Sequence, residues 1–308
     1  IYCNINDSLI FTNCAQIGRF GPSQSQVDST YSGTNLDGNV ISNNGIQEWI
    51  VPTTGSYSIT TIGAQGGNLG GLGANVTGDY FLTAGMVLRI LVGQEGTFVS
   101  SGSNDGGGGG GGSFVEGNST LLTAAGGGGG LTTQYSSYIA PFDSAISDGQ
   151  TGDAGGSTNT NGGGINGNGG QEGTVDCCLP GNVGASGGGG YLTDGNNGSI
   201  TNGGIAFLNG GNGGAGGGLG EGGFGGGSGC TYDNAVRSGA GGGYSGGQGG
   251  TFTYPLPIAY SHGGGGGSYG TGANLTILGG VNVGHGLVII SYSTQTCTGC
   301  TDPAALNY

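Results

Sequence analysis

The sequence predicts an all-β protein: a sandwich of antiparallel strands that carries an inserted bundle of extended glycine helices, with almost no α-helix. Glycine makes up 85 of the 308 residues, and each glycine costs a helix about 1 kcal/mol relative to alanine. Short segments rich in β-branched and aromatic residues occur near both ends of the chain. Long glycine runs lie between them, and side chains recur there at a spacing of three residues.

The strand-like segments are separated by Gly, Asn, Pro or Thr residues, which favour turns. Tyr57 and Ile59 alternate with Ser58 and Thr60, so one face of this strand should be buried and the other partly buried. We expect one sandwich whose last strand follows a long insertion. The predicted strands are 8–13, 46–52, 55–64, 74–82, 86–94, 274–280 and 284–293, with a hairpin at 113–125.

The glycine region is densest from Gly203 to Gly250, where most non-glycine residues keep one register that Leu219 breaks. A polyproline-type helix has three residues per turn and no internal hydrogen bonds, so glycine edges let neighbouring segments bond to one another. The alternative is a disordered linker, which would not be expected to contain Phe224 and Tyr244. The residues on the register are Asn209, Asn212, Ala215, Glu221, Phe224 and Cys230.

The chain has a net charge of -14 and no lysine, and its only arginines are Arg19, Arg89 and Arg237. A nucleic-acid partner is not expected, because binding phosphates needs a basic patch. An anionic membrane surface is disfavoured for the same reason. No apolar run approaches the roughly 18 residues of a membrane span, so we expect no direct membrane insertion.

The seven cysteines are spread along the chain, as expected for disulfides in an oxidising, extracellular compartment. Only the CTGC motif has zinc-ligand spacing, so no metal is expected. Cys177 and Cys178 should reach different partners, one of which is expected to be Cys230. The disulfide candidates are Cys3, Cys14, Cys177, Cys178, Cys230 and Cys297, and Cys300 is expected to pair outside the chain.

Little in the sequence indicates catalysis, and we expect neither an enzyme nor a cofactor. His262 and His285 have no GxSxG-type motif to support a triad. The glycine run 106–112 lacks the lysine of a phosphate-binding loop. The acidic residues match no calcium motif.

Two sets of residues are candidates for modification or contact. Rigidly held aromatic side chains are good interface anchors, although they can equally fill gaps between the bundle and the sandwich. The interface candidates are Tyr135, Tyr138, Phe142, Phe252, Tyr254 and Tyr260. The N-glycosylation sequons start at Asn6, Asn75, Asn118, Asn197 and Asn274.

Several motifs occur in the order found in a known family: IGAQGG, LRILVGQEG, GGGGGGGSFV, LLTAAGGGGG, GGFGGGSGC, GAGGGYSGG and GHGLVIISY. With GRFGPSQSQVDSTYSGT near the start, the region from Phe11 to Tyr292 resembles the glycine-rich extracellular domain of the anaplastic lymphoma kinase and leukocyte tyrosine kinase receptors. The resemblance implies a jelly-roll, tumour-necrosis-factor-like sandwich with an inserted bundle of glycine helices. Where the receptors have a second cysteine, this chain has Val27, which leaves Cys14 available to a partner such as Cys3.

The segment GCTDPAALNY at 299–308 resembles the start of a cysteine-bounded repeat of secreted proteins. That repeat continues past the tyrosine to another cysteine, which would supply the partner of Cys300 and imply a longer modular parent. The expected domains are a sandwich at 1–125 and 273–296, an inserted glycine bundle at 126–272, and the start of this repeat at 297–308.

We therefore predict a non-enzymatic extracellular protein with a structural or adhesive role at the cell surface, in an appendage or as a filament subunit. Self-association or contact with neighbouring surface proteins is expected. The alternative is a recognition module that binds a protein or glycan ligand, as the receptor resemblance suggests.

Overall fold

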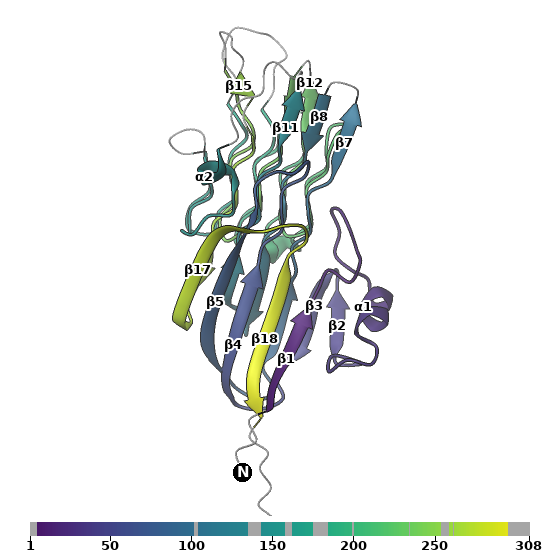
Figure 1. Ribbon diagram of the computed structural model, residues 1–308, viewed down its shortest axis with the longest axis vertical. Coiled ribbons are helices and arrows are strands. Elements are labelled where there is room, and N and C mark those ends of the chain that lie inside the picture. The colour runs from purple at the N-terminus through teal and green to yellow at the C-terminus, as the bar shows by residue number, and fades with distance from the viewer. Residues whose placement is uncertain are drawn as a thin grey trace, which may run out of the picture.

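Two antiparallel sheets form one end of an elongated molecule, and glycine-rich segments form the other end (Figure 1). The computed structural model describes residues 5–101, 104–134, 143–157, 162–174, 184–198, 200–233, 235–253, 259–260 and 262–294. The predicted all-β class is confirmed. The helices in the described residues are α1 (Gln24–Tyr31), α2 (Ser144–Ser147) and a 3₁₀ turn at Phe207–Asn209.

The two large sheets contain five and six strands. In spatial order, the first consists of β1 (Ile5–Phe11), β18 (Leu287–Thr294), β4 (Gly55–Ile62), β5 (Gly73–Leu82) and β17 (Ala273–Asn282). The second consists of β16 (Tyr269–Gly270), β10 (Thr120–Ala125), β9 (Ser113–Gly117), β6 (Val87–Leu91), β3 (Ile46–Ile50) and β2 (Val40–Asn43).

Three smaller sheets lie in the glycine-rich half of the molecule (Figure 1). They consist of β11 (Thr132–Gln134), β8 (Asn104–Gly107) and β7 (Phe98–Ser101); β12 (Thr231–Asp233) and β13 (Ala235–Arg237); and β14 (Phe252–Thr253) and β15 (Ala259–Tyr260).

The predicted strands and the hairpin are all present. β9 and β10 form that hairpin, whose turn residues Asn118 and Ser119 both have positive φ. The last strand, β18, returns after the insertion and pairs with β1 on one side and β4 on the other. Along β4 the buried and partly buried positions alternate as predicted, with Tyr57 and Ile59 buried.

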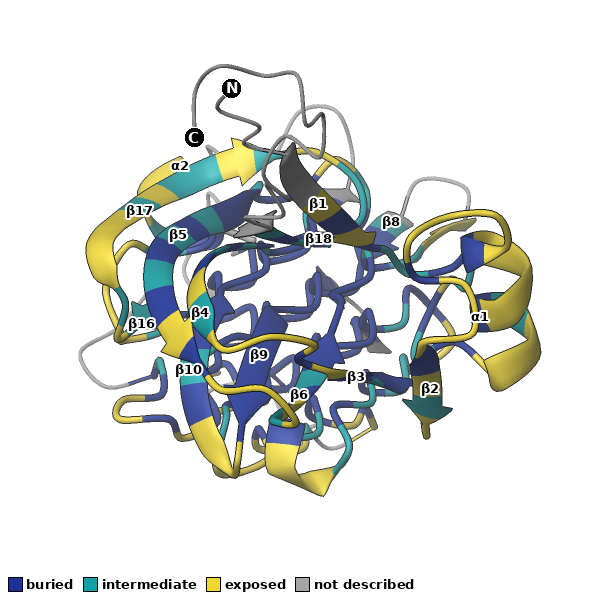
Figure 2. Ribbon diagram, turned by 90° about the horizontal axis from the view of Figure 1, so that it is seen from below, coloured by how far each residue is buried: buried dark blue, intermediate teal, exposed yellow. Residues whose placement is uncertain are grey.

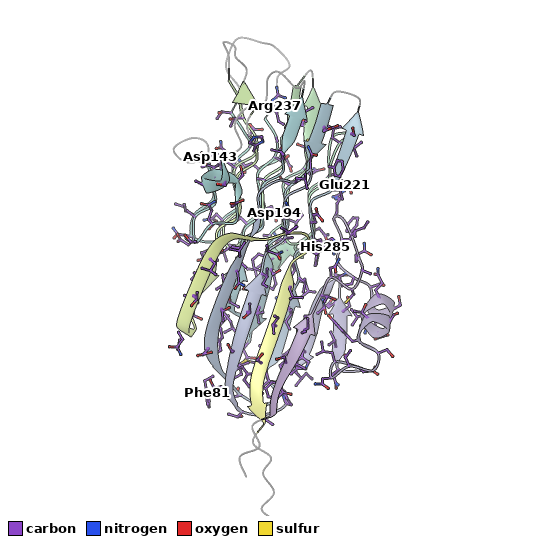
Figure 3. All side chains as sticks on the ribbon, in the orientation of Figure 1. Phe81, Asp143, Asp194, Glu221, Arg237 and His285 are labelled. Carbon is purple, nitrogen blue, oxygen red and sulfur yellow. The ribbon has the colours of Figure 1, made fainter. Side chains whose placement is uncertain are left out.

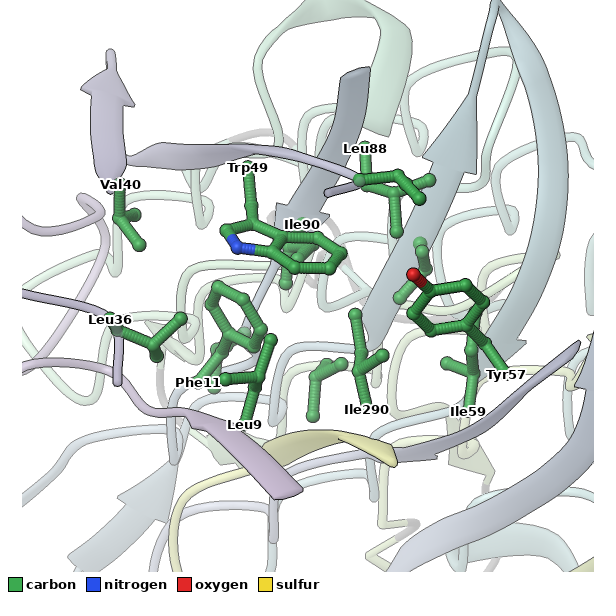
Figure 4. Packing of buried hydrophobic residues seen from close by; sticks show 14 of the residues in the cluster. Leu9, Phe11, Leu36, Val40, Trp49, Tyr57, Ile59, Leu88, Ile90 and Ile290 are labelled. Atoms are coloured by element: carbon green, nitrogen blue, oxygen red, sulfur yellow. The ribbon is translucent and has the colours of Figure 1, made fainter. Parts of the chain in front are cut away.

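A hydrophobic core fills the space between the two sheets. Trp49 of β3 packs edge-on against Phe11 of β1 and Tyr57 of β4, with 6.4 Å between ring centroids in each pair. Ile290 and Leu88 contribute from the facing sheets (Figure 4). Each fully buried side chain of this size stabilises the fold by about 1.5–3 kcal/mol, so this core holds the sandwich together.

Helix α1 and strand β2 were not predicted. Residues 22–32 contain no glycine, and Ser23 and Gln26 form a capping box at the start of α1. The helix buries Val27 and Tyr31 in the sandwich core. After β2, Asn44 and Gly45 have φ of 50° and 89°, the geometry for which an Asn-Gly hairpin turn is favoured.

The glycine-rich segments bond to one another in a repeating pattern. Along Gly107–Gly112, successive amides donate to three different neighbouring segments, and every third amide returns to the same one. The bonds join Gly107 to Leu131, Gly108 to Thr97, Gly109 to Ser228, Gly110 to Gly128, Gly111 to Gln94 and Gly112 to Gly225, with N···O distances of 2.8–3.0 Å. A period of three is expected of polyproline-type glycine helices; that helical conformation and the jelly-roll topology stay predictions.

The array leaves no room for side chains. A Cβ on Gly109 would overlap the carbonyl oxygen of Ala240, and one on Gly128 would overlap that of Gly71. Seen from below, these packed segments are buried in the interior of the molecule (Figure 2). The array includes glycines before position 126 as well as after it. The earlier ones, such as Gly107–Gly112, belong to segments that connect strands of the sandwich.

A second, smaller core joins the array to the sandwich. Leu91 and Phe114, on the outer side of the six-stranded sheet, pack with Phe207 and Phe224 from the glycine-rich region. Phe114 and Phe207 have ring centroids 5.1 Å apart. The two halves of the molecule therefore share a hydrophobic contact as well as backbone hydrogen bonds.

Replacing Gly109 with alanine should destabilise the protein strongly, because its Cβ meets a backbone carbonyl that cannot move without breaking neighbouring bonds. Overpacking of this kind typically costs about 1–3 kcal/mol or more. The matched control is Gly152→Ala, since a Cβ there meets nothing within 4 Å and the residue is exposed. Chemical unfolding of both variants checks this; equal stability would contradict the packed array.

Candidate recognition surfaces

The ends of the described chain and the far end of the glycine bundle lie at opposite poles of the molecule. Ile5 at the start of β1 pairs with Thr294 at the end of β18, so both ends leave from the base of the sandwich. β7, β8, β11 and β12 lie near the other pole (Figure 1). A partner that binds at that pole would contact the molecule far from the ends of the described chain.

The structure brings together two of the six predicted interface aromatics. Phe252 of β14 and Tyr260 of β15 are directly opposite each other in a two-stranded ladder. Tyr135, Tyr138, Phe142 and Tyr254 lie outside the described residues. The contact role of this set stays a prediction.

Sequence reasoning missed two apolar residues near the far pole. Phe98 and Val99 of β7 are 56% and 45% exposed, in a strand that pairs with β8. Their signal in the sequence was a short apolar pair between Thr97 and Ser100. An exposed aromatic on a strand that is hydrogen-bonded to the glycine array is suited to binding a partner.

A cluster of polar residues ties the bundle to the six-stranded sheet. The Arg89 guanidinium lies 3.1 Å from the buried Glu116 carboxylate, and the Tyr191 hydroxyl donates to the other oxygen of Glu116 at 3.1 Å. Arg89 also lies 4.9 Å from the ring centroid of Phe207. Burial, followed by the negative charge of Glu116, raises the pKa of Tyr191 to about 12. Because the polar groups of Arg89, Glu116 and Tyr191 bind one another, we assign this cluster a structural role.

The two histidines lie in different places. His285 lies where the sandwich meets the bundle (Figure 3), and its Nδ1 accepts a hydrogen bond from the Glu95 backbone N–H at 3.0 Å. Burial lowers the pKa of His285 below its usual value, although Glu95 acts in the opposite direction. His262 is buried beside the glycine run that follows it.

An apolar groove of about 400 Å³ opens at one edge of the sandwich. Leu9 and Tyr292 line it from the five-stranded sheet, and Trp49, Ile41 and Ile50 line it from the other sheet. Ile41 and Ile50 are exposed. The groove lies near the ends of the described chain, at the pole opposite the bundle.

The two cysteines among the described residues are buried, and they are not bonded to each other. Cys14 lies in the sandwich core, and Cys230 packs with Leu219 and Val236 in the bundle. Burial raises the pKa of Cys230, while the nearby Arg237 acts to lower it. The other candidates lie outside the described residues, so the predicted disulfide pairing stays a prediction; they are Cys3, Cys177, Cys178, Cys297 and Cys300.

The predicted sequons differ in accessibility. Asn118, Asn197 and Asn274 are exposed, and Asn75 is partly buried on β5. The side chains of Asn197 and Asn274 already form hydrogen bonds, to the backbone N–H of Gly203 and to Asp79. Asn6 lies on β1, and its side chain is not described.

Among the described residues there is neither a metal-binding cluster nor a membrane-spanning helix. No three His, Cys, Asp or Glu side chains in that part of the chain are grouped so as to hold a metal ion. The helices found there are all too short or too polar to cross a membrane.

Comparison with protein-family models finds no match for this chain. A curated relative is the leukocyte tyrosine kinase receptor of Mus musculus, which is 36% identical over 96 residues. The match covers 28% of this chain and only 11% of the receptor. The chain is therefore weakly related to that receptor over part of its length, and the C-terminal repeat lies outside the described residues.

Stability should fall as the pH decreases below about 6.5, the ordinary pKa of histidine. The folded state holds His285 neutral, whereas the unfolded chain binds a proton there first, so protonation favours unfolding between the two pKa values. The variant His285→Gln should flatten this dependence, because glutamine does not titrate in this range. Unfolding free energies at pH 5 to 8 check this; an unchanged slope in His285→Gln would contradict the assignment.

Proposed function

We propose that the chain is a non-enzymatic extracellular module that recognises a partner at the far pole of a rigid glycine bundle. The observation that carries this proposal is the polarity of the molecule: the chain enters and leaves at the base of the sandwich, and exposed Phe98 and Val99 lie toward the opposite pole. The sandwich then serves as the base and the bundle as the support of the contact surface.

The glycine array supports this role because backbone hydrogen bonds, and not side-chain packing, hold its segments in place. Amides in Gly107–Gly112 are bonded to neighbouring segments, and binding surfaces that are already ordered lose less entropy on association. The weak relation to a receptor over 28% of the chain is compatible with a surface or recognition module. An extracellular location also fits the cysteine content.

Replacing Phe98 with serine should weaken partner binding by about thirtyfold, since buried aromatic anchors typically contribute about 2 kcal/mol or more. The matched control is Phe81→Ser, which removes a 73% exposed phenylalanine from β5 at the opposite pole (Figure 3). The probe is an array of purified extracellular proteins and glycans, presented to the chain immobilised through its C-terminus.

The readout is the dissociation constant of each hit for the wild type and both variants. Loss in Phe98→Ser with retention in Phe81→Ser is the expected result. Loss only in Phe81→Ser, or equal binding by all three proteins, would contradict a contact surface at the far pole.

A second candidate is a structural subunit that assembles with its own copies, and the edge strand β17 favours it. Among the described residues, this ten-residue strand pairs only with β5. Leu278 and Val281 are exposed on it. Long, exposed edge strands tend to pair with other strands. Light scattering at graded concentration, with Leu278→Lys as the disrupting variant, tests this; a monomer at every concentration would exclude it.

A further inference from the structure

A polar hollow of about 640 Å³ lies where the segment before α1 meets the glycine-rich region. Its walls come from residues 16–26, from the β2–β3 turn and from residues 209–212. The volume is within the range of about 300–1,000 Å³ found for small-molecule sites. This hollow is separate from the far pole, so it goes beyond the function proposed above.

The lining has an unusual chemistry for so acidic a protein. It includes Phe20, Ser23 and Ser42, and it contains no charged residue. Each side-chain amide offers two N–H donors and a carbonyl oxygen with two lone pairs. The amides that line the hollow are Gln16, Gln24, Gln26, Asn44, Asn209 and Asn212.

The backbone on either side of Phe20 is fixed to the glycine-rich region. The Phe224 N–H donates to the Gly18 carbonyl and the Gly213 N–H donates to the Arg19 carbonyl, both at 2.8 Å. The Gln94 side chain donates to the Phe20 carbonyl at 3.0 Å. These bonds hold Phe20 in place although its side chain is 56% exposed.

The ring of Phe20 is also oriented. The Arg19 guanidinium lies 5.2 Å from its centroid, a distance at which a cation is attracted to the ring face. The opposite face of the ring is therefore the one left for a ligand. Arg19 itself is fixed, since its Nε donates to the Gly213 carbonyl at 3.0 Å.

Two glycines bring the walls of the hollow together. Gly21 and Gly45 both line it, and a Cβ on either residue would overlap the backbone of the other. A Cβ on Gly21 would also lie 2.6 Å from the Phe224 ring. The shape of the hollow thus depends on close backbone contact, as the glycine array does.

Several lining amides are held in one orientation before any ligand binds. Gln26 donates to the Gln16 side-chain oxygen at 2.8 Å and accepts from the Ser23 N–H at 2.9 Å. Asn209 donates to Asp194 at 2.9 Å, which leaves its carbonyl oxygen available. Among the described residues, the side-chain amide of Asn212 forms no hydrogen bond and is also available. Donors and acceptors fixed in advance lower the entropic cost of binding.

We propose that this hollow binds a neutral saccharide. Sugar hydroxyls both donate and accept hydrogen bonds, as the amides do, and the C–H face of a sugar ring can pack on the free face of Phe20. The net charge of -14 disfavours an anion, and a cation would require carboxylates in the lining. A peptide is less well matched, because the hollow has no row of apolar pockets for alternate side chains.

The test uses the full chain and four neutral disaccharides: maltose, cellobiose, lactose and N,N′-diacetylchitobiose. A glucuronic-acid-containing disaccharide serves as the charged comparison. Calorimetric titration and ligand-observed NMR measure binding to the wild type, to Phe20→Ala and to Asn212→Ala. The matched control is Phe81→Ala, which removes an exposed phenylalanine from β5. Circular dichroism confirms that each variant is folded.

We expect at least one neutral disaccharide to bind, Phe20→Ala to weaken that binding at least tenfold, and Asn212→Ala to weaken it less. Phe81→Ala and the far-pole variant Phe98→Ser should leave it unchanged. The proposal is overturned if no neutral disaccharide binds, if only the charged disaccharide binds, or if Phe20→Ala binds like the wild type. In each of those cases, a loss of partner binding in Phe98→Ser would still support the contact surface at the far pole. The two proposals can therefore be contradicted independently.

Discussion

The fold depends on backbone hydrogen bonds between glycine segments that lie too close for any side chain. Buried backbone N–H and C=O groups must be satisfied, and no amide of Gly107–Gly112 donates to a carbonyl of its own segment. Each amide of Gly107–Gly112 therefore uses a neighbouring segment, and the neighbours change with a period of three. Ordering glycine costs roughly 1–2 kcal/mol per residue, and this dense network is what offsets that cost.

The same constraint extends into the sandwich and connects its two ends. Ala64 and Gln94 follow sandwich strands and bond to the array, while Phe207 and Phe224 from the glycine-rich region cover the outer side of the six-stranded sheet. The contact surface at the far pole and the polar hollow beside α1 are therefore supported by one continuous body. Both proposed sites use exposed aromatic residues whose backbones that body holds in place.

The strands could be predicted because alternation and β-branched residues mark a buried face, as Tyr57 and Ile59 show. Helix α1 was missed because the high glycine content of the whole chain was applied to residues 22–32, which contain none. The partners of each glycine segment could not be predicted, since one glycine run looks like another. The polar hollow also could not be predicted from the sequence, because Gln16, Asn44 and Asn212 are far apart in the chain and come together only in the folded structure.

Amide hydrogen exchange of the glycine segments tests the central claim most directly. If the array is a hydrogen-bonded body, the amides of Gly107–Gly112 should exchange only when the sandwich unfolds. Their protection factors should then match those of the β4 amides. The contradictory result would be exchange at unfolded rates along these glycines while β4 stays protected. In that case the glycine region would be a linker, and neither proposed site would have a rigid support.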